Sequence, residues 1–118
     1  MIDKSVLIAI LNSIVEPVLF VDTDHVIRFS NTDADKYYGK LGYSDLLDKS
    51  IFDWHNPDSS RIIREVFQAF LDGEEERYLT TNDDGFRVYM RAVRDADGQL
   101  LGYYERYEAA AEHRSEPA

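Results

Sequence analysis

The sequence predicts one domain of the α+β class, with a five-stranded antiparallel sheet and helices on one of its faces. The length of 118 residues and the hydrophobic content of 44% suit one domain with one core. Strand patterns fall into two groups, two near the N-terminus and three near the C-terminus, and helical patterns separate them. Short turn motifs join neighbouring strands within each group, which favours antiparallel pairing.

The first predicted element is a helix over residues 3–14. Asp3 or Ser5 can cap its start, and Pro17 ends the segment. Apolar residues recur on one face at helical spacing. They are Val6, Leu7, Ile10, Leu11 and Ile14. This stripe needs cover, either from the domain's own sheet or from a second copy of the chain.

A hairpin and two short helical segments follow. Residues 18–22 and 26–30 predict two strands joined by a tight turn. After Asn31, residues 32–38 predict a helix closed by a glycine. Residues 43–48 predict one more helical turn.

The second half predicts a long helix and three strands. Residues 58–72 form the helix, and Asn56 and Pro57 mark its start. The turn motifs Asp83-Asp84-Gly85 and Asp97-Gly98 separate the strands. The predicted strands are residues 77–82, 86–95 and 100–108.

Charge and composition exclude several classes of function. The chain has 13 basic and 23 acidic residues, a net charge of −10, which argues against binding nucleic acid or an anionic membrane. The apolar run from Val6 to Ile10 is far too short to span a bilayer, and no signal-peptide pattern is present. The absence of cysteine excludes disulfides and thiolate metal sites. These features predict a cytoplasmic protein.

Several motifs, in this order and spacing, resemble the PAS domain family. They are Val18–Asp22, Val26–Asn31, Asp48–Asp53, Ala92–Asp95 with Asp97-Gly98, and Leu101–Tyr103. The resemblance implies strand order 2-1-5-4-3, a pocket between sheet and helices, sensing of small ligands, and dimerisation through the N-terminal helix. It divides the chain into an N-terminal helix for dimerisation or capping (1–16), a PAS core (17–108) and a short helix or tail (109–118).

Within the family, the chain looks most similar to PAS domains found beside hemerythrin-like domains. Those carry a His-x-Pro-x-x-Ser element at the start of the long helix, which here reads His55 to Ser60. They also carry an arginine in the second strand, here Arg28, and a glutamate in the last strand, here Glu105.

Alternation along the strands gives the candidate ligand residues, since successive side chains point to opposite faces. The resemblance indicates which face of the sheet points at the pocket. That face includes Arg28 of the second strand and Leu101, Tyr103 and Glu105 of the last. Because a buried carboxylate needs a partner, Arg28 and Glu105 are expected to pair or to hold a polar ligand. The full candidate set is Arg28, Trp54, His55, Met90, Tyr103, Glu105 and Tyr107.

The residues also limit the cofactor. Cysteinyl-flavin chemistry is excluded because the chain has no cysteine. Haem needs an axial ligand, and His55 is the only histidine in the helical half, where a cap or hydrogen-bonding role is the more common one. No spacing of histidines and acids predicts a metal site. A small organic ligand fits the aromatic and polar residues better.

Three functions remain open at this stage. The first is a PAS sensory module that binds a small molecule and signals through a homodimer or a separate signalling protein. The second is a ligand-free PAS domain used for dimerisation or protein interaction. The third, a small α+β isomerase that uses Glu105 with Tyr103 or Tyr107, lacks any catalytic motif, so a non-enzymatic role is expected.

Overall fold

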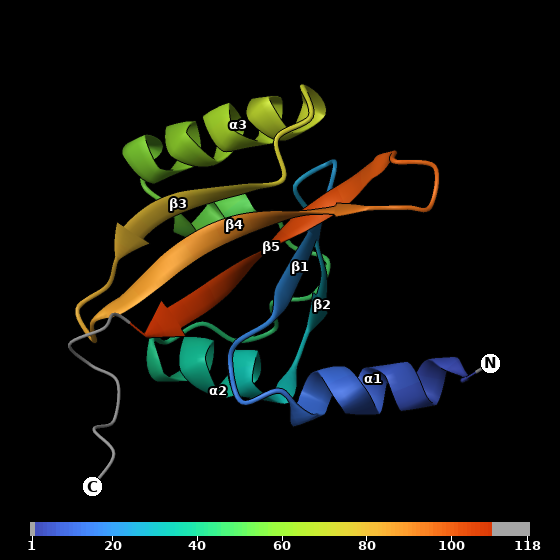
Figure 1. Ribbon diagram of the computed structural model, residues 1–118. Helices are drawn as coiled ribbons and strands as arrows, with labels where there is room; N and C mark the ends of the chain where they lie inside the picture. The colour runs from blue at the N-terminus through green and yellow to red at the C-terminus, as the bar shows by residue number, and fades with distance from the viewer. Residues whose placement is uncertain (1, 110–118) are drawn as a thin grey trace, which may run out of the picture.

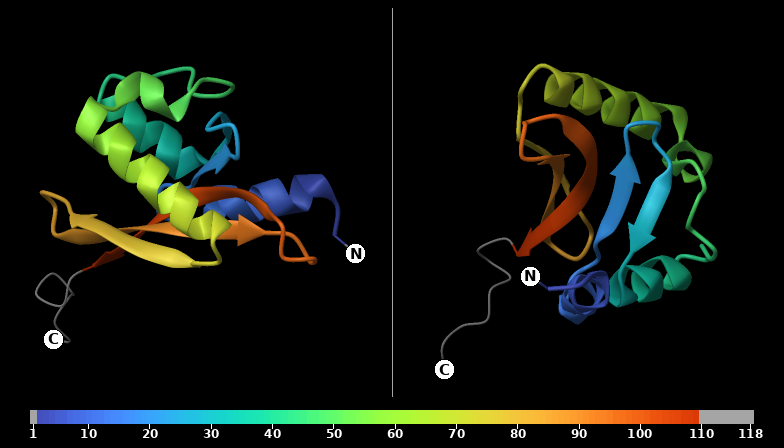
Figure 2. Two further views of the ribbon diagram at one scale, coloured as in Figure 1. Left: turned by 90° about the horizontal axis from the view of Figure 1, so that it is seen from above. Right: turned by 90° about the vertical axis from the view of Figure 1, so that its right-hand side faces the viewer.

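The computed structural model describes residues 2–109 and shows one five-stranded sheet with helices on one face (Figures 1 and 2). The elements are α1 (Lys4–Ser13), β1 (Leu19–Asp22), β2 (Ile27–Ser30), α2 (Thr32–Lys40), the 3₁₀ helix η1 (Ile51–Trp54), α3 (Pro57–Leu71), β3 (Glu76–Thr81), β4 (Phe86–Arg94) and β5 (Leu100–Ala109). All neighbouring strands are antiparallel, and their order, β2-β1-β5-β4-β3, confirms the expected one. Beyond Ala109, the predicted short helix or tail lies outside the described residues.

Side-chain caps decide where the three α-helices begin. Asp3, Asn31 and Asn56 each adopt an extended backbone and accept a hydrogen bond from the N–H group three residues on. Such a bond satisfies one of the N–H groups that have no partner within the helix. Pro57 occupies the first position of α3, where the missing N–H costs nothing.

The helical turn predicted at 43–48 is wrong, because the turn forms later, as η1. Asp45 and Asp48 have φ values of 53° and 67°, in the left-handed region that interrupts a right-handed helix. Ser50 then caps η1 by accepting a hydrogen bond from the Phe52 N–H at 3.2 Å.

A bulge between β1 and β2 places Arg28 outside. Phe20 pairs with Phe29 and Val21 pairs with Ile27, so Arg28 is the extra residue on β2. Ile27 is fully buried, while Arg28 is exposed. The expected inward position of Arg28 is therefore wrong, because the bulge shifts the alternation by one residue.

A second bulge changes the start of β5. Val93 pairs with Gly102 but Arg94 pairs with Leu100, which leaves Leu101 without an opposite residue. Leu100 lies in the core and Leu101 is 44% exposed. The predicted inward position of Leu101 is wrong for the same physical reason as that of Arg28.

The core lies between the sheet and the helices. Beyond the second bulge β4 and β5 pair regularly, with Met90 opposite Glu105 and Ala92 opposite Tyr103. From α3, Ile63, Val66 and Phe70 face this layer, as helical periodicity requires. The core cluster comprises Leu19, Val21, Ile27, Leu46, Ile51, Ile63, Val66, Phe70, Met90, Ala92, Leu100 and Tyr103.

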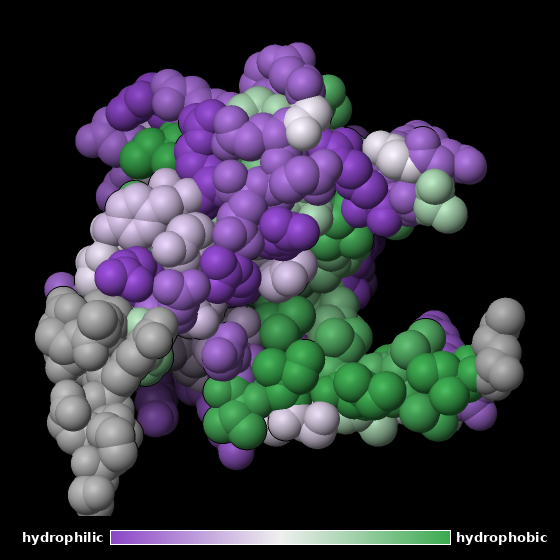
Figure 3. All heavy atoms as spheres, viewed as in Figure 1, coloured by the Kyte–Doolittle hydropathy of each residue, from purple (hydrophilic) through white to green (hydrophobic). Residues whose placement is uncertain are grey.

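Helix α1 has no buried residue and extends from the body as an apolar arm (Figures 1 and 3). An apolar groove of about 460 Å³ lies between its C-terminal turn and the outer face of β1, β2 and β5. The groove is lined by Leu11, Ile14, Val18, Phe20, Phe29, Val93 and Tyr104. Within residues 2–109, no helix has the length and apolar character that crossing a bilayer requires.

Candidate functional site

Two spaces adjoin between the sheet and α3. The inner cavity measures only about 20 Å³. An open groove between α3 and β3 measures about 380 Å³ and shares His55, Ile63 and Glu105 with the cavity. The cavity is lined by Leu19, Val21, Tyr38, Ile51, His55, Ile63, Met90, Tyr103 and Glu105. The groove is lined by His55, Ser59, Ile62, Ile63, Leu79, Thr80, Val88 and Glu105.

Glu105 is the acid at the junction of these spaces. Strand alternation points its side chain from β5 toward the helices, as the sequence predicted. The Tyr107 hydroxyl donates a hydrogen bond to its Oε2 atom at 3.1 Å. Burial raises the pKa of Glu105, and the bond from Tyr107 and the nearby His55 only partly oppose this. Burial also raises the pKa of Tyr38 and Tyr107 beside it.

His55 follows η1 and faces both spaces. Its Nδ1 lies 2.7 Å from the main-chain carbonyl oxygen of Ile51. Because a carbonyl oxygen can only accept, Nδ1 must carry the proton of this hydrogen bond. In the neutral ring, Nε2 is then a hydrogen-bond acceptor.

Tyr103 makes a contact that the sequence did not reveal. Its hydroxyl lies 2.9 Å from Nδ1 of His25, in the β1–β2 turn. The His25 ring also packs against Phe52 and Phe67, with centroids 4.8 and 4.6 Å apart. Burial, with Arg64 as the second cause, lowers the pKa of His25. The sequence placed His25 in a turn, and no local signal indicates that the turn folds beneath α3.

Two predicted ligand residues lie away from the site. Arg28 forms ion pairs with Asp22 at 2.7 Å and Asp48 at 2.8 Å, so the expected pair with Glu105 is wrong. The bulge in β2 is the cause, since it turns the guanidinium outward. Trp54 stacks on Tyr43 at 5.4 Å and lines neither the cavity nor the groove. The other five candidates, His55, Met90, Tyr103, Glu105 and Tyr107, lie on or beside the cavity.

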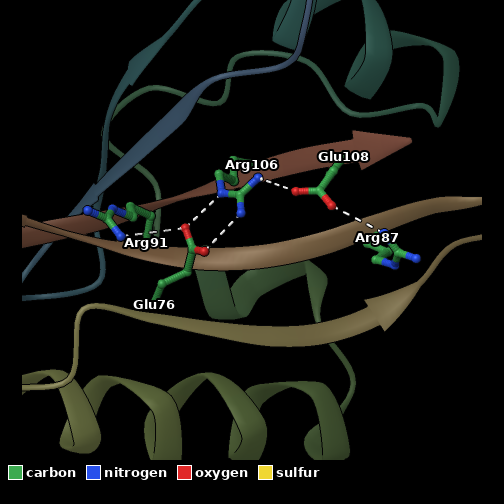
Figure 4. Close-up of polar contacts among 5 residues, drawn as sticks. All are labelled: Glu76, Arg87, Arg91, Arg106 and Glu108. Carbon is green, nitrogen blue, oxygen red and sulfur yellow. Dashed lines mark hydrogen bonds and ion pairs between the residues drawn. The ribbon is translucent and has the colours of Figure 1, made fainter. Parts of the chain in front are cut away.

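The opposite face of the sheet carries a network of ion pairs instead (Figure 4). Glu76 accepts two hydrogen bonds from Arg106, at 2.7 and 2.9 Å, and lies 3.7 Å from Arg91. Glu108 links Arg106 to Arg87, at 3.2 Å on each side. These pairs join β3, β4 and β5 across the outer face and satisfy one another.

The site does not suit the metal cofactors considered. The inner cavity has room for about one water molecule, far less than a haem needs. Among residues 2–109, no group of three or more metal-ligating side chains occurs.

Sheet order 2-1-5-4-3, helices over one face and a small cavity between them together define the PAS class of α+β domain. The sequence profile described as "PAS domain" matches residues 7–108, and the chain belongs to the PAS domain family. The resemblance to PAS domains beside hemerythrin-like domains stays a prediction.

Solved structures share the fold at low identity. The C-terminal domain of a protein from Streptococcus mutans is 19% identical, with a TM-score of 0.75 over 94% of this chain and 87% of that one. A PAS domain from Colwellia psychrerythraea is 12% identical, with a TM-score of 0.66 over 92% and 98%. The PAS domain of histidine kinase ThkA is 20% identical, with a TM-score of 0.57 over 79% and 98%. No curated protein matches the sequence significantly.

Proposed function

We propose that this PAS domain is a cytoplasmic, non-enzymatic sensory module that binds a small organic molecule in the groove between α3 and β3. The observation that carries the proposal is Glu105, a half-buried carboxyl group that lies at the inner end of that groove and accepts a hydrogen bond from Tyr107. Polar groups that converge in a largely apolar concave site are typical of ligand binding. The fold shared with the PAS domain of a histidine kinase supports a signalling role.

The size of the two spaces favours the groove over the inner cavity. Ligand pockets commonly measure about 300–1,000 Å³. The groove, at about 380 Å³, falls in that range, whereas the cavity, at about 20 Å³, does not. A ligand in the groove touches both α3 and the edge strand β3, so its binding can alter how the helix packs on the sheet.

A fragment screen by protein-observed NMR tests the groove. Thr80 is exposed on β3 and lines the groove, so Thr80→Trp fills it without disturbing the core. Thr81→Trp is the matched control, because Thr81 is also exposed but does not line the groove. Fragments are expected to shift the amide signals of Ser59 and Thr80, and to bind the Thr81 variant but not the Thr80 variant. Binders that persist in Thr80→Trp, or a screen without binders, contradict the proposal.

A second candidate is a PAS domain that acts by dimerisation alone, and the surface of α1 favours it. No charged residue occurs from Ser5 to Val15, in a chain whose net charge is −10. Two copies therefore meet with least repulsion at this surface. Val6, Leu7 and Ile10 are 42%, 48% and 49% exposed there, beside the apolar groove. The same surface can relay ligand binding between two copies.

Sedimentation velocity across a range of concentrations tests this surface. Ile10→Asp is expected to convert a dimer to a monomer, because it places a charge in the apolar contact. Leu71→Asp is the control, since Leu71 is 52% exposed on α3, away from α1. A wild-type protein that stays monomeric, or equal effects of the two substitutions, counts against dimerisation through α1.

A further inference from the structure

The groove presents hydrogen-bond acceptors at its inner end. The Glu105 carboxylate, when ionised, only accepts, and one of its oxygens already accepts from Tyr107. The Ile51 carbonyl holds the proton of His55 on Nδ1, so Nε2 of the neutral ring accepts as well. A ligand that satisfies both residues must therefore bring hydrogen-bond donors, and an ammonium group offers three N–H donors on one atom.

The groove also lacks a permanent positive charge of its own. None of its lining residues is a lysine or an arginine. Every arginine ion pair among residues 2–109 goes to another acid, and none joins His55 or any other side chain to Glu105. Glu105 is half-buried, and a carboxylate partly removed from water without a cation is costly, so a cationic ligand gains from supplying the missing charge. The net charge of −10 adds a long-range attraction for cations.

Beyond its acidic end the groove is apolar. Ile62, Leu79 and Val88 line it from α3, β3 and β4. The hydroxyl groups of Ser59 and Thr80 are the other polar side-chain groups in the groove. A hydrocarbon chain or ring along these side chains is removed from water, at about 25 cal/mol per Å² of apolar surface. The ligand is thus expected to be amphipathic, with one polar end.

We propose that the groove between α3 and β3 takes a small protonated organic amine, with its ammonium group on Glu105 and Nε2 of His55 and its apolar part along Ile62, Leu79 and Val88. This inference rests on the proposed function, because it names the class of ligand for the same groove. The shape of the groove alone admits amines, alcohols and carboxylic acids, and the chemistry of Glu105 and His55 favours the amines.

A matched series of probes tests it. Hexylamine, hexanol and hexanoate share one hydrocarbon chain and differ in the polar end. Each is titrated into the protein at neutral pH, and the dissociation constant is measured from the amide shifts of groove residues. Hexylamine is expected to bind about tenfold more tightly than hexanol, since a charge-assisted hydrogen bond exceeds a neutral one by roughly 1.4 kcal/mol. Hexanoate is expected to bind most weakly, because its carboxylate has no proton to donate and the net charge of −10 opposes an anion.

Two variants test whether the preference for hexylamine over hexanol depends on Glu105. Glu105→Gln keeps the shape and removes the charge, so it is expected to make hexylamine and hexanol bind about equally. Glu108→Gln, on the same strand but paired with Arg87 on the outer face, is expected to keep the tenfold preference. Circular dichroism confirms that both variants fold.

The results distinguish a failure of the amine inference from a failure of the groove as a ligand site. Hexanol or hexanoate binding in the groove as tightly as hexylamine overturns the amine inference and still supports groove binding. A hexylamine preference that survives Glu105→Gln also overturns it. If none of the three shifts the groove residues, both the amine inference and the proposed groove function fail.

Discussion

The side chain of Asn31 holds the last turn of α1, with its Nδ2 donating a hydrogen bond of 2.9 Å to the main-chain carbonyl of Leu11. The same Nδ2 donates to the Glu16 carbonyl at 3.0 Å. Its Oδ1 accepts from the N–H groups of Val18, at 2.9 Å, and Ala34, at 2.8 Å. Because α1 buries none of its residues, this fully buried amide supplies much of the link between α1 and the core.

Asn31→Asp is expected to destabilise the domain by about 1–3 kcal/mol or more and to release α1. A carboxylate keeps the acceptor but faces the Leu11 and Glu16 carbonyls without a donor. Asn12→Asp is the control, since exposed Asn12 only accepts, from the Thr32 N–H at 3.1 Å, and is expected to cost under about 1 kcal/mol. Urea denaturation measures stability, and hydrogen exchange of α1 measures its release. Equal effects of the two substitutions contradict the role given to Asn31.

Gly102→Ala is expected to destabilise the fold, because β1 and β5 approach too closely for a side chain there. An added Cβ would lie 2.1 Å from the Val21 carbonyl oxygen and 2.8 Å from the Phe20 ring. The ring can move but the backbone cannot, so a cost of about 1–3 kcal/mol or more is expected. Gly39→Ala, in α2, meets no atom within 4 Å and is expected to be neutral or to stabilise by up to about 1 kcal/mol. Thermal unfolding compares them, and a melting temperature of Gly102→Ala at or above the wild-type value refutes the close approach.

Glu105→Gln is expected to stabilise the protein increasingly as the pH rises. The pKa of Glu105 is raised in the folded state, so over the window above its ordinary value the folded state holds a proton that the unfolded state has released. Wild-type stability therefore falls with rising pH across this window, by at most about 1.4 kcal/mol per pH unit, and the loss is complete above the raised pKa. The groups facing Glu105 are His55, Tyr38, Tyr103 and Tyr107.

Glu76→Gln provides a control of opposite sign. Hydrogen bonds from Arg106 lower the pKa of Glu76, so its contribution is present above the ordinary pKa and is lost as the pH falls through the lowered one. The stability difference from wild type, measured by urea denaturation at several pH values, should thus run in opposite directions for the two variants. If Glu105→Gln instead behaves like Glu76→Gln, a cation pairs with the Glu105 carboxylate in the folded state, which contradicts its raised pKa.

His25 is expected to titrate below its ordinary pKa of 6.5, mainly because its ring is buried under α3. Its ring signals, followed by NMR against pH, give the midpoint directly. Arg64→Gln removes the second cause and should move the midpoint partly back toward 6.5. Since the unfolded chain takes up this proton first, His25 makes the fold less stable as the pH falls below 6.5. A midpoint at or above 6.5 would show that the turn does not pack as described.

The elements and their order were predictable because local signals mark them. Asp3, Asn31 and Asn56 cap the helices that follow, and the Asp97-Gly98 turn separates two strands. The helical turn predicted at 43–48 forms instead at η1, because Asp45 and Asp48 adopt left-handed backbone conformations in the earlier segment. No local sequence pattern predicts these two conformations. The division into residues 1–16, 17–108 and 109–118 stays a prediction.

The candidate site was predictable only where strand pairing is regular. Met90 and Tyr103 line the cavity with Glu105, and Tyr107 bonds to it, because β4 and β5 alternate without interruption there. The predicted inward positions of Arg28 and Leu101 are wrong because bulges shift the alternation by one residue. A bulge depends on which residues of two distant segments pair, which one segment does not reveal.

The caps, the periodic faces, the PAS resemblance and the acid at position 105 follow from the sequence, because they depend on residue types at short spacing. Tertiary packing brings His25 to Tyr103, places Asn31 against α1, and opens Glu105 onto a groove rather than onto Arg28. Each of these contacts joins residues far apart in the chain, so only the packing of β-sheet and helices brings them together.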